Sequence, residues 1–121
     1  MAVILIVEDD ASIRELVELV LQDSGYETLS ASDVEEATRL LCSRRTIDAM
    51  FTDINLKSAV FGGCDVAKLA IMFRPGMPIL YTTAMSTGEK LRAQFPKDAR
   101  FLPKPYSQSD LLGSVEYSLR S

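Results

Sequence analysis

Five short runs of strand-forming residues are spaced along the chain, with polar residues after each. The first run, residues 2–7, reads AVILIV and is unbroken, apolar and rich in β-branched side chains. Such a run is typical of a strand buried on both faces of a parallel sheet. Four further runs predict strands, at 26–31, 48–53, 77–84 and 99–102.

Helical periodicity fills the segments between these runs. From Ile13 onward, apolar residues fall at i, i+3, i+4, i+7 and i+8, as on one face of a helix. Asp10, or Ser12 with Glu15, offers an N-cap for this helix, and Gly25 marks its end. Similar signals predict four more helices, after a Ser32–Glu35 capping box, from Gly62-Gly63 to Phe73, around 87–95, and from Ser107 onward.

Five strands therefore alternate with five helices, without an internal repeat or a linker in the sequence. Strict alternation implies parallel strands joined by right-handed crossovers, with helices on both faces of the sheet. The length of 121 residues is near the commonest domain size. The pattern predicts one α/β domain over residues 1–121.

Composition and charge narrow the choice of partners. The chain is 47% hydrophobic and 25% charged, which is ordinary for a soluble globular domain. The formal net charge is −4 and the nearest approach to a basic cluster is Arg44-Arg45, so we expect no nucleic-acid surface. No apolar run approaches the ~18 residues of a membrane span, and run 2–7 is too short for a signal peptide. We expect a cytoplasmic protein that does not bind membranes.

The chain contains no histidine, and this limits its chemistry. Ser-His-Asp and Cys-His catalysis and the zinc protease motifs are excluded. Cys42 and Cys64 form no CxxC motif, and we interpret them as reduced thiols. Any reaction must use carboxylates, hydroxyls, lysine or a group supplied by a partner.

Chemically reactive side chains stand at the C-terminal ends of the predicted strands, where ligands bind in open parallel sheets. Two like charges at ~5 Å repel by about 3 kcal/mol at an effective dielectric constant of roughly 20. A cluster of carboxylates at this edge therefore needs a positive partner, either a lysine or a hard divalent cation such as Mg²⁺. The side chains in question are Glu8, Asp9, Asp53, Thr82, Thr83 and Lys104.

This set of groups suits phosphoryl transfer. A carboxylate is ionised at neutral pH and can act as a nucleophile without a general base. Mg²⁺, a lysine and a hydroxyl around it match the charge on the oxygens of a transferring phosphoryl group. Because the chain lacks histidine, a phosphohistidine donor would have to come from a partner.

Four motifs, taken together, resemble the receiver domain of two-component response regulators. They are VEDD (7–10), FTDINL (51–56), PILYTTA (78–84) and FLPKPYS (101–107), and the resemblance covers essentially the whole chain. It implies a flavodoxin-like (βα)5 fold with strand order 2-1-3-4-5. It also implies a phosphoacceptor signalling domain that catalyses its own phosphorylation and slow autodephosphorylation, rather than an enzyme that turns over a substrate.

The resemblance assigns the phosphoryl chemistry to residues that match the family's motifs. Asp53 is implied as the phosphoacceptor, and Thr83 and Lys104 each bind an oxygen of its phosphoryl group. Thr83 and Phe101 occupy the positions of the family's switch residues. The peptide bond between Lys104 and Pro105 is expected to be cis, as it is in the family.

The implied cofactor is Mg²⁺. Asp9 and Asp53 would be direct ligands, together with the backbone carbonyl of Asn55. Glu8 would act mainly through bound water.

The implied partner is a histidine kinase or a histidine phosphotransfer protein. Phosphorylation would shift the surface formed by helix 87–95, strand 99–102 and the last helix, and so control a downstream protein or relay phosphate. We expect a stand-alone receiver. Two alternatives stay open, a phosphorylation-independent interaction module and a receiver excised from a hybrid histidine kinase.

Three positions depart from the family's common pattern. The loop over 57–63 lacks the usual proline and is longer, which affects its shape and the choice of partner. Phe101 lacks the hydroxyl of the commoner tyrosine, so any switching there acts through packing alone. Met85 stands two residues beyond Thr83, where we expect substitution by Glu or Lys to alter the lifetime of the phosphorylated form.

Overall fold

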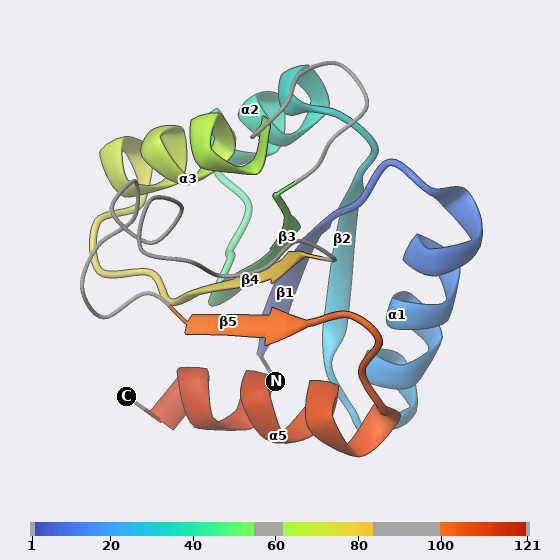
Figure 1. Cartoon of the computed structure of the whole chain (residues 1–121). Coiled ribbons are helices and arrows are strands. Elements are labelled where there is room, and N and C mark those ends of the chain that lie inside the picture. Colours follow the sequence, from blue (N-terminus) through green and yellow to red (C-terminus); the bar gives the residue numbers. More distant parts are fainter. Residues whose placement is uncertain (1, 55–61, 84–99, 121) are drawn as a thin grey trace.

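A computed structural model describes residues 2–54, 62–83 and 100–120 (Figure 1). Four of the predicted helices lie within these residues, as do all five predicted strands except for Ala84 and Ala99 at the ends of two of them. Asn55, Met85, the predicted helix 87–95 and the 57–63 loop up to residue 61 lie outside them. The elements are β1 (Val3–Val7), α1 (Ala11–Asp23), β2 (Glu27–Ala31), α2 (Val34–Cys42), β3 (Ala49–Asp53), α3 (Gly62–Phe73), β4 (Ile79–Thr83), β5 (Arg100–Pro103) and α5 (Gln108–Arg120).

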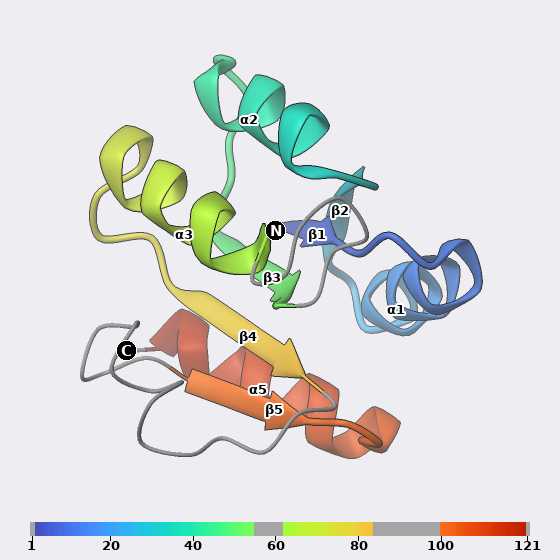
Figure 2. The same cartoon turned by 45° about the horizontal axis from the view of Figure 1, so that its top comes forward.

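The five strands form one parallel sheet in the order β2-β1-β3-β4-β5, which confirms the predicted fold class and strand order. Helices α2 and α3 cover one face of the sheet, and α1 and α5 cover the other (Figures 1 and 2). The register pairs Val7 of β1 with Thr52 of β3 and pairs Asp53 with Thr82 of β4. The C-terminal ends of β1, β3 and β4 therefore meet at one edge of the sheet.

Strand β1 has no polar residue because both of its faces are buried. Ile4 and Ile6 pack among residues of α1 and α5, whereas Leu5 and Val7 pack among residues of α2 and α3. Alternate side chains of a strand point to opposite faces, so an apolar run of this length occupies both cores at once. Strand β1 is thus packed on both faces, and the acidic residues follow directly after it.

Helix α1 begins immediately after these acidic residues. Asp10 is its N-cap and accepts hydrogen bonds from the backbone N–H of Ser12 at 2.9 Å and of Ile13 at 3.2 Å. The carboxylate thus satisfies N–H groups that have no partner within the helix. Of the two predicted caps, Asp10 is the one the structure uses. Gly25, beyond the end of the helix, has a φ of +92°, a value that favours glycine.

The predicted Ser32–Glu35 capping box of α2 is wrong by one residue. Asp33 is the N-cap and accepts from the Glu36 N–H at 2.8 Å, while the Glu36 carboxylate accepts from the Ser32 N–H at 2.6 Å. Aspartate caps a helix as well as serine does, so two adjacent candidates could not be separated by residue type.

Among the described helices, none has the length and apolar character needed to cross a membrane. Cys42, the last residue of α2, is an exposed free thiol.

Candidate functional site

The ends of β1 and β3 bring three carboxyl groups together. One carboxylate oxygen from each of Glu8, Asp9 and Asp53 lies within 4.8 Å of the others. The pairing of Val7 with Thr52 places the residues that follow them side by side, which explains the convergence. Glu8 and Asp53 are only 1% and 4% exposed. The charges therefore meet in a largely dehydrated place, where their repulsion is strong.

Lys104 supplies a positive charge to this cluster. Its Nζ lies 2.7 Å from Asp53 Oδ2 and 3.3 Å from Glu8 Oε1. Lys104 follows β5 and its backbone N–H donates to the Thr83 carbonyl at 3.0 Å, which fixes where the side chain starts. The peptide bond between Lys104 and Pro105 is cis, as the family resemblance implied.

Burial and neighbouring charges shift the pKa values of Glu8 and Lys104. Burial, followed by the charge of Asp53, raises the pKa of Glu8 from 4.5 to about 7. Burial acts to lower the pKa of Lys104, but the hydrogen bonds and charges of Asp53 and Glu8 together outweigh it, and the net pKa is raised. Lys104 therefore stays cationic, and without a further cation Glu8 holds a proton near neutral pH.

The donor set fits a hard divalent cation. Mg²⁺ binds oxygen ligands and is commonly held by one or two carboxylates together with water and phosphate oxygens. Glu8, Asp9 and Asp53 offer such oxygens close together, and one ammonium group does not balance three carboxylates. Asn55 lies outside the described residues, so its backbone carbonyl remains a predicted ligand.

Arg14, which the sequence analysis did not single out, stabilises the acidic segment Glu8–Asp10. Arg14, in α1, donates from Nη1 to the backbone carbonyl of Glu8 at 2.9 Å. The Glu8 carboxylate in turn accepts from the Asp10 N–H at 3.2 Å. These bonds hold the main chain and the side chain of Glu8 in place. The signal in the sequence was a basic residue one turn into the helix that follows an acidic run.

Tyr106 is a second residue close to the site. Its ring meets Phe51 edge-on, with centroids 6.1 Å apart and planes inclined by 72°. Burial raises the pKa of its hydroxyl, Lys104 lowers it, and the Glu8 and Asp53 charges raise it further. The phenol therefore lies within electrostatic reach of the cluster.

The two predicted switch residues lie on β4 and β5. Thr83 is buried at the end of β4, one residue beyond the register partner of Asp53. The Phe101 ring packs against Tyr81 with centroids 5.5 Å apart and planes inclined by 30°. Thr83 therefore lies beside the C-terminal end of β3, and Phe101 packs within the sheet against β4; their switch roles stay predictions.

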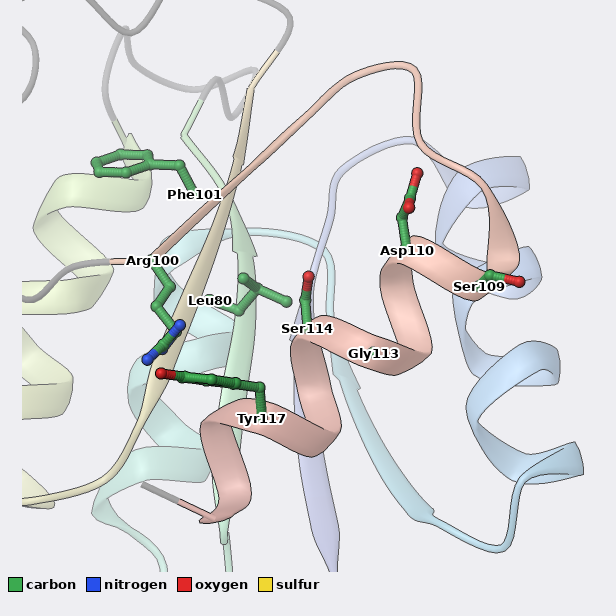
Figure 3. Close-up of a pocket in the computed structure, with 8 residues that line it drawn as sticks. All are labelled: Leu80, Arg100, Phe101, Ser109, Asp110, Gly113, Ser114 and Tyr117. Atoms are coloured by element: carbon green, nitrogen blue, oxygen red, sulfur yellow. The ribbon is translucent and has the colours of Figure 1, made fainter.

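A hollow of about 500 Å³ lies beside β5 and α5 (Figure 3). The Arg100 guanidinium carbon lies 3.6 Å from the centre of the Tyr117 ring of α5. Figure 3 shows Phe101 extending to the other side of β5. Neighbouring residues of β5 thus contact opposite sides of the sheet, so a movement of the strand would affect both.

Comparison with known proteins identifies the class of this fold and site. The family model described as the response regulator receiver domain matches residues 4–116. The chain belongs to this family. It is 31% identical over 118 residues to the response regulator MprA of Mycolicibacterium vanbaalenii, covering 97% of this chain and 50% of that protein. The chain therefore spans about half the length of the curated relatives it matches.

Solved structures agree with this assignment. A response regulator receiver protein from Sinorhizobium medicae superposes with a TM-score of 0.90 at 28% identity, covering 99% of this chain and 95% of that one. The chemotaxis protein CheY4 of Vibrio cholerae superposes with a TM-score of 0.84 at 31% identity, covering 98% of both chains.

Proposed function

We propose that this receiver accepts a phosphoryl group on Asp53 in a reaction that requires Mg²⁺. The observation that carries the proposal is the 2.7 Å contact of Lys104 with Asp53 inside the cluster of acidic residues. This contact orients the Asp53 carboxyl group beside a cation that can pair with the incoming oxygens.

The donor is a phosphohistidine of a partner histidine kinase or histidine phosphotransfer protein. An oxygen of Asp53 forms a bond to phosphorus while the phosphorus–nitrogen bond of the donor breaks, and the departing imidazole takes up a proton. Lys104 and the hydroxyl of Thr83 each bind an oxygen of the transferred group. Asp9 and Asp53, with Glu8 acting through water, would hold Mg²⁺, which would supply positive charge to offset that of the phosphoryl group.

The added charge changes the balance of the domain's two conformations. A phosphoryl group brings a charge of roughly −2, which attracts Thr83 and repacks Phe101. Because Phe101 and Arg100 contact opposite sides of β5, the change reaches the surface of β5 and α5. That surface controls a downstream partner or relays phosphate, and slow autodephosphorylation resets it.

Incubation with acetyl phosphate and Mg²⁺, followed by intact mass measurement, tests the proposal. We expect the wild type to gain one phosphoryl group and the Asp53→Asn variant to gain none. Omission of Mg²⁺ should abolish the gain. An equal gain in Asp53→Asn would reject Asp53 as the acceptor, and no gain in the wild type would favour a phosphorylation-independent interaction module.

A further inference from the structure

A buried hydroxyl in β4 lacks a hydrogen-bond partner in the part of the chain that the structure describes. Thr82 is 0% exposed, and its Oγ1 makes no hydrogen bond there. The neighbouring buried threonine, Thr52, differs because its Oγ1 donates to the Asp53 carbonyl at 3.3 Å. An unpaired buried hydroxyl costs stability that valine, with the same shape, would not. The hydroxyl of Thr82 is therefore unfavourable to the stability of the unmodified protein.

Thr82 lies near the C-terminal end of β4, beside the strand that carries Asp53. It is the register partner of Asp53 on one side and of Leu102 on the other. Residues paired in parallel strands point to the same face, so Thr82 shares the α1–α5 face with Asp53. Phe51, Leu80 and Leu102 on this face belong to one apolar cluster. The hydroxyl lies between that cluster and the charged site.

The side chain of Lys104 spans the C-terminal end of β4. Lys104 follows β5 and contacts Asp53 at the end of β3, and β4 lies between these two strands. The lysine stem therefore crosses the C-terminal end of β4, whose last two residues are Thr82 and Thr83. Of the three N–H groups of the ammonium, Asp53 and Glu8 account for two among the described residues.

We propose that Thr82 is a positioning residue whose hydroxyl accepts a hydrogen bond from Lys104 once Asp53 is phosphorylated. This inference rests on the proposed function. A phosphoryl group on Asp53 fills space beside Oδ2 and moves the ammonium back toward β5, which is the direction of Thr82. The hydroxyl then holds the ammonium against a phosphoryl oxygen. The Thr82 hydroxyl has no described partner before phosphorylation and gains one afterwards. The hydrogen bond it gains stabilises the phosphorylated form.

Binding of beryllofluoride, a non-covalent mimic of a phosphoryl group, tests this in the presence of Mg²⁺. Thermal unfolding with and without the mimic, and titration calorimetry, are compared for the wild type, Thr82→Val and Thr82→Ser. We expect Thr82→Val to raise the Tm of the unliganded protein but to weaken beryllofluoride binding about tenfold. Thr82→Ser, which keeps the hydroxyl, should bind like the wild type.

Thr52→Val is the matched control, because Thr52 is a buried threonine whose hydroxyl already has a partner and which lies on the other face of the sheet. It should lower the Tm without changing beryllofluoride affinity. Equal affinity of Thr82→Val and the wild type would overturn the inference, as would a Thr82→Ser variant as weak as Thr82→Val. No binding by the wild type would overturn the proposed function and this inference together.

Discussion

Lys104 and Asp53 lie 51 positions apart in the sequence, and they meet through a 2.7 Å contact that spans the end of the intervening strand. The side chain of Asp53 is 6% exposed and that of Lys104 is 22% exposed, so the contact is largely shielded from water. The same ammonium contacts Glu8 at 3.3 Å. Lys104 and a divalent cation would therefore compete for the same carboxylates, although the proposed function uses both in phosphoryl transfer.

Replacement of Lys104 by glutamine should separate these two effects. Loss of the ammonium removes a competing positive charge, so we expect Mg²⁺ affinity to rise roughly tenfold. The phosphorylation rate with acetyl phosphate should fall about a hundredfold, because a group that stabilises the transferring oxygens is lost. Calorimetry measures the first effect and time-resolved intact mass the second. Lys68→Gln, at an exposed position of α3, should change neither quantity.

A fall of Mg²⁺ affinity in Lys104→Gln would show that the lysine organises the carboxylates rather than competing for them. An unchanged phosphorylation rate would remove Lys104 from the chemistry.

The raised pKa of Glu8 predicts how stability depends on pH without metal. The pKa is about 7 in the folded protein and 4.5 ordinarily, so the folded state binds the proton more tightly. Its contribution is fully present below pH 4.5 and is lost as pH rises through about 7. The free energy of unfolding in EDTA should therefore fall between pH 5 and pH 8, by at most about 3 kcal/mol from this group.

Urea unfolding across this pH range provides the measurement, with Glu8→Gln as the control. Glutamine cannot ionise, so the variant should lose most of the pH dependence. A wild type whose stability is constant or increases over this interval would contradict the environment described for Glu8.

Much of the fold can be predicted from local sequence, because the hydrophobic patterns of the strands and helices each favour one kind of element. The unbroken run 2–7 fits only a strand buried on both faces, and that places Glu8 and Asp9 at the edge of the sheet. The acidic cluster was therefore predictable before any contact was known. The N-cap of α2 was not, because Ser32 and Asp33 are adjacent residues of similar capping strength.

The supporting contacts of the site depend on tertiary packing and could not be derived in the same way. The reach of Arg14 to the Glu8 carbonyl depends on the angle between β1 and α1. The placement of Tyr106 depends on how the segment after Lys104 packs on Phe51. Whether the Thr82 hydroxyl finds a hydrogen-bond partner depends on how β3, β4 and β5 lie beside one another, and among the described residues it finds none.

Metal binding should release protons in the neutral range. Near pH 6.5 Glu8 holds a proton for much of the time, and a divalent cation in the cluster favours its ionised form. We expect close to one proton released per Mg²⁺ at pH 6 and almost none at pH 8.5. Calorimetry in buffers of different ionisation enthalpy gives the number directly. Glu8→Gln should release none, and an equal release from this variant would assign the proton to another group.

The contact of Arg14 with the Glu8 carbonyl should contribute to both stability and metal binding. Arg14→Gln removes a hydrogen bond from a cationic donor to a partly buried carbonyl, so we expect a loss of about 1.5 kcal/mol in the free energy of unfolding. Because the same bond fixes the main chain that carries Glu8 and Asp9, Mg²⁺ affinity should fall by a few fold. Urea unfolding and calorimetry measure the two effects.

Arg120→Gln is the matched control for this substitution. Arg120 pairs with Glu116 on the exposed side of α5, where an ion pair contributes little because water and salt screen it. Its loss should change the free energy of unfolding by less than about 0.5 kcal/mol and leave Mg²⁺ affinity unaltered. If Arg14→Gln behaved like Arg120→Gln in both measurements, Arg14 would have no part in shaping the site. The N-cap of α1 and the strand pairing of β1 would then account for the position of the acidic segment.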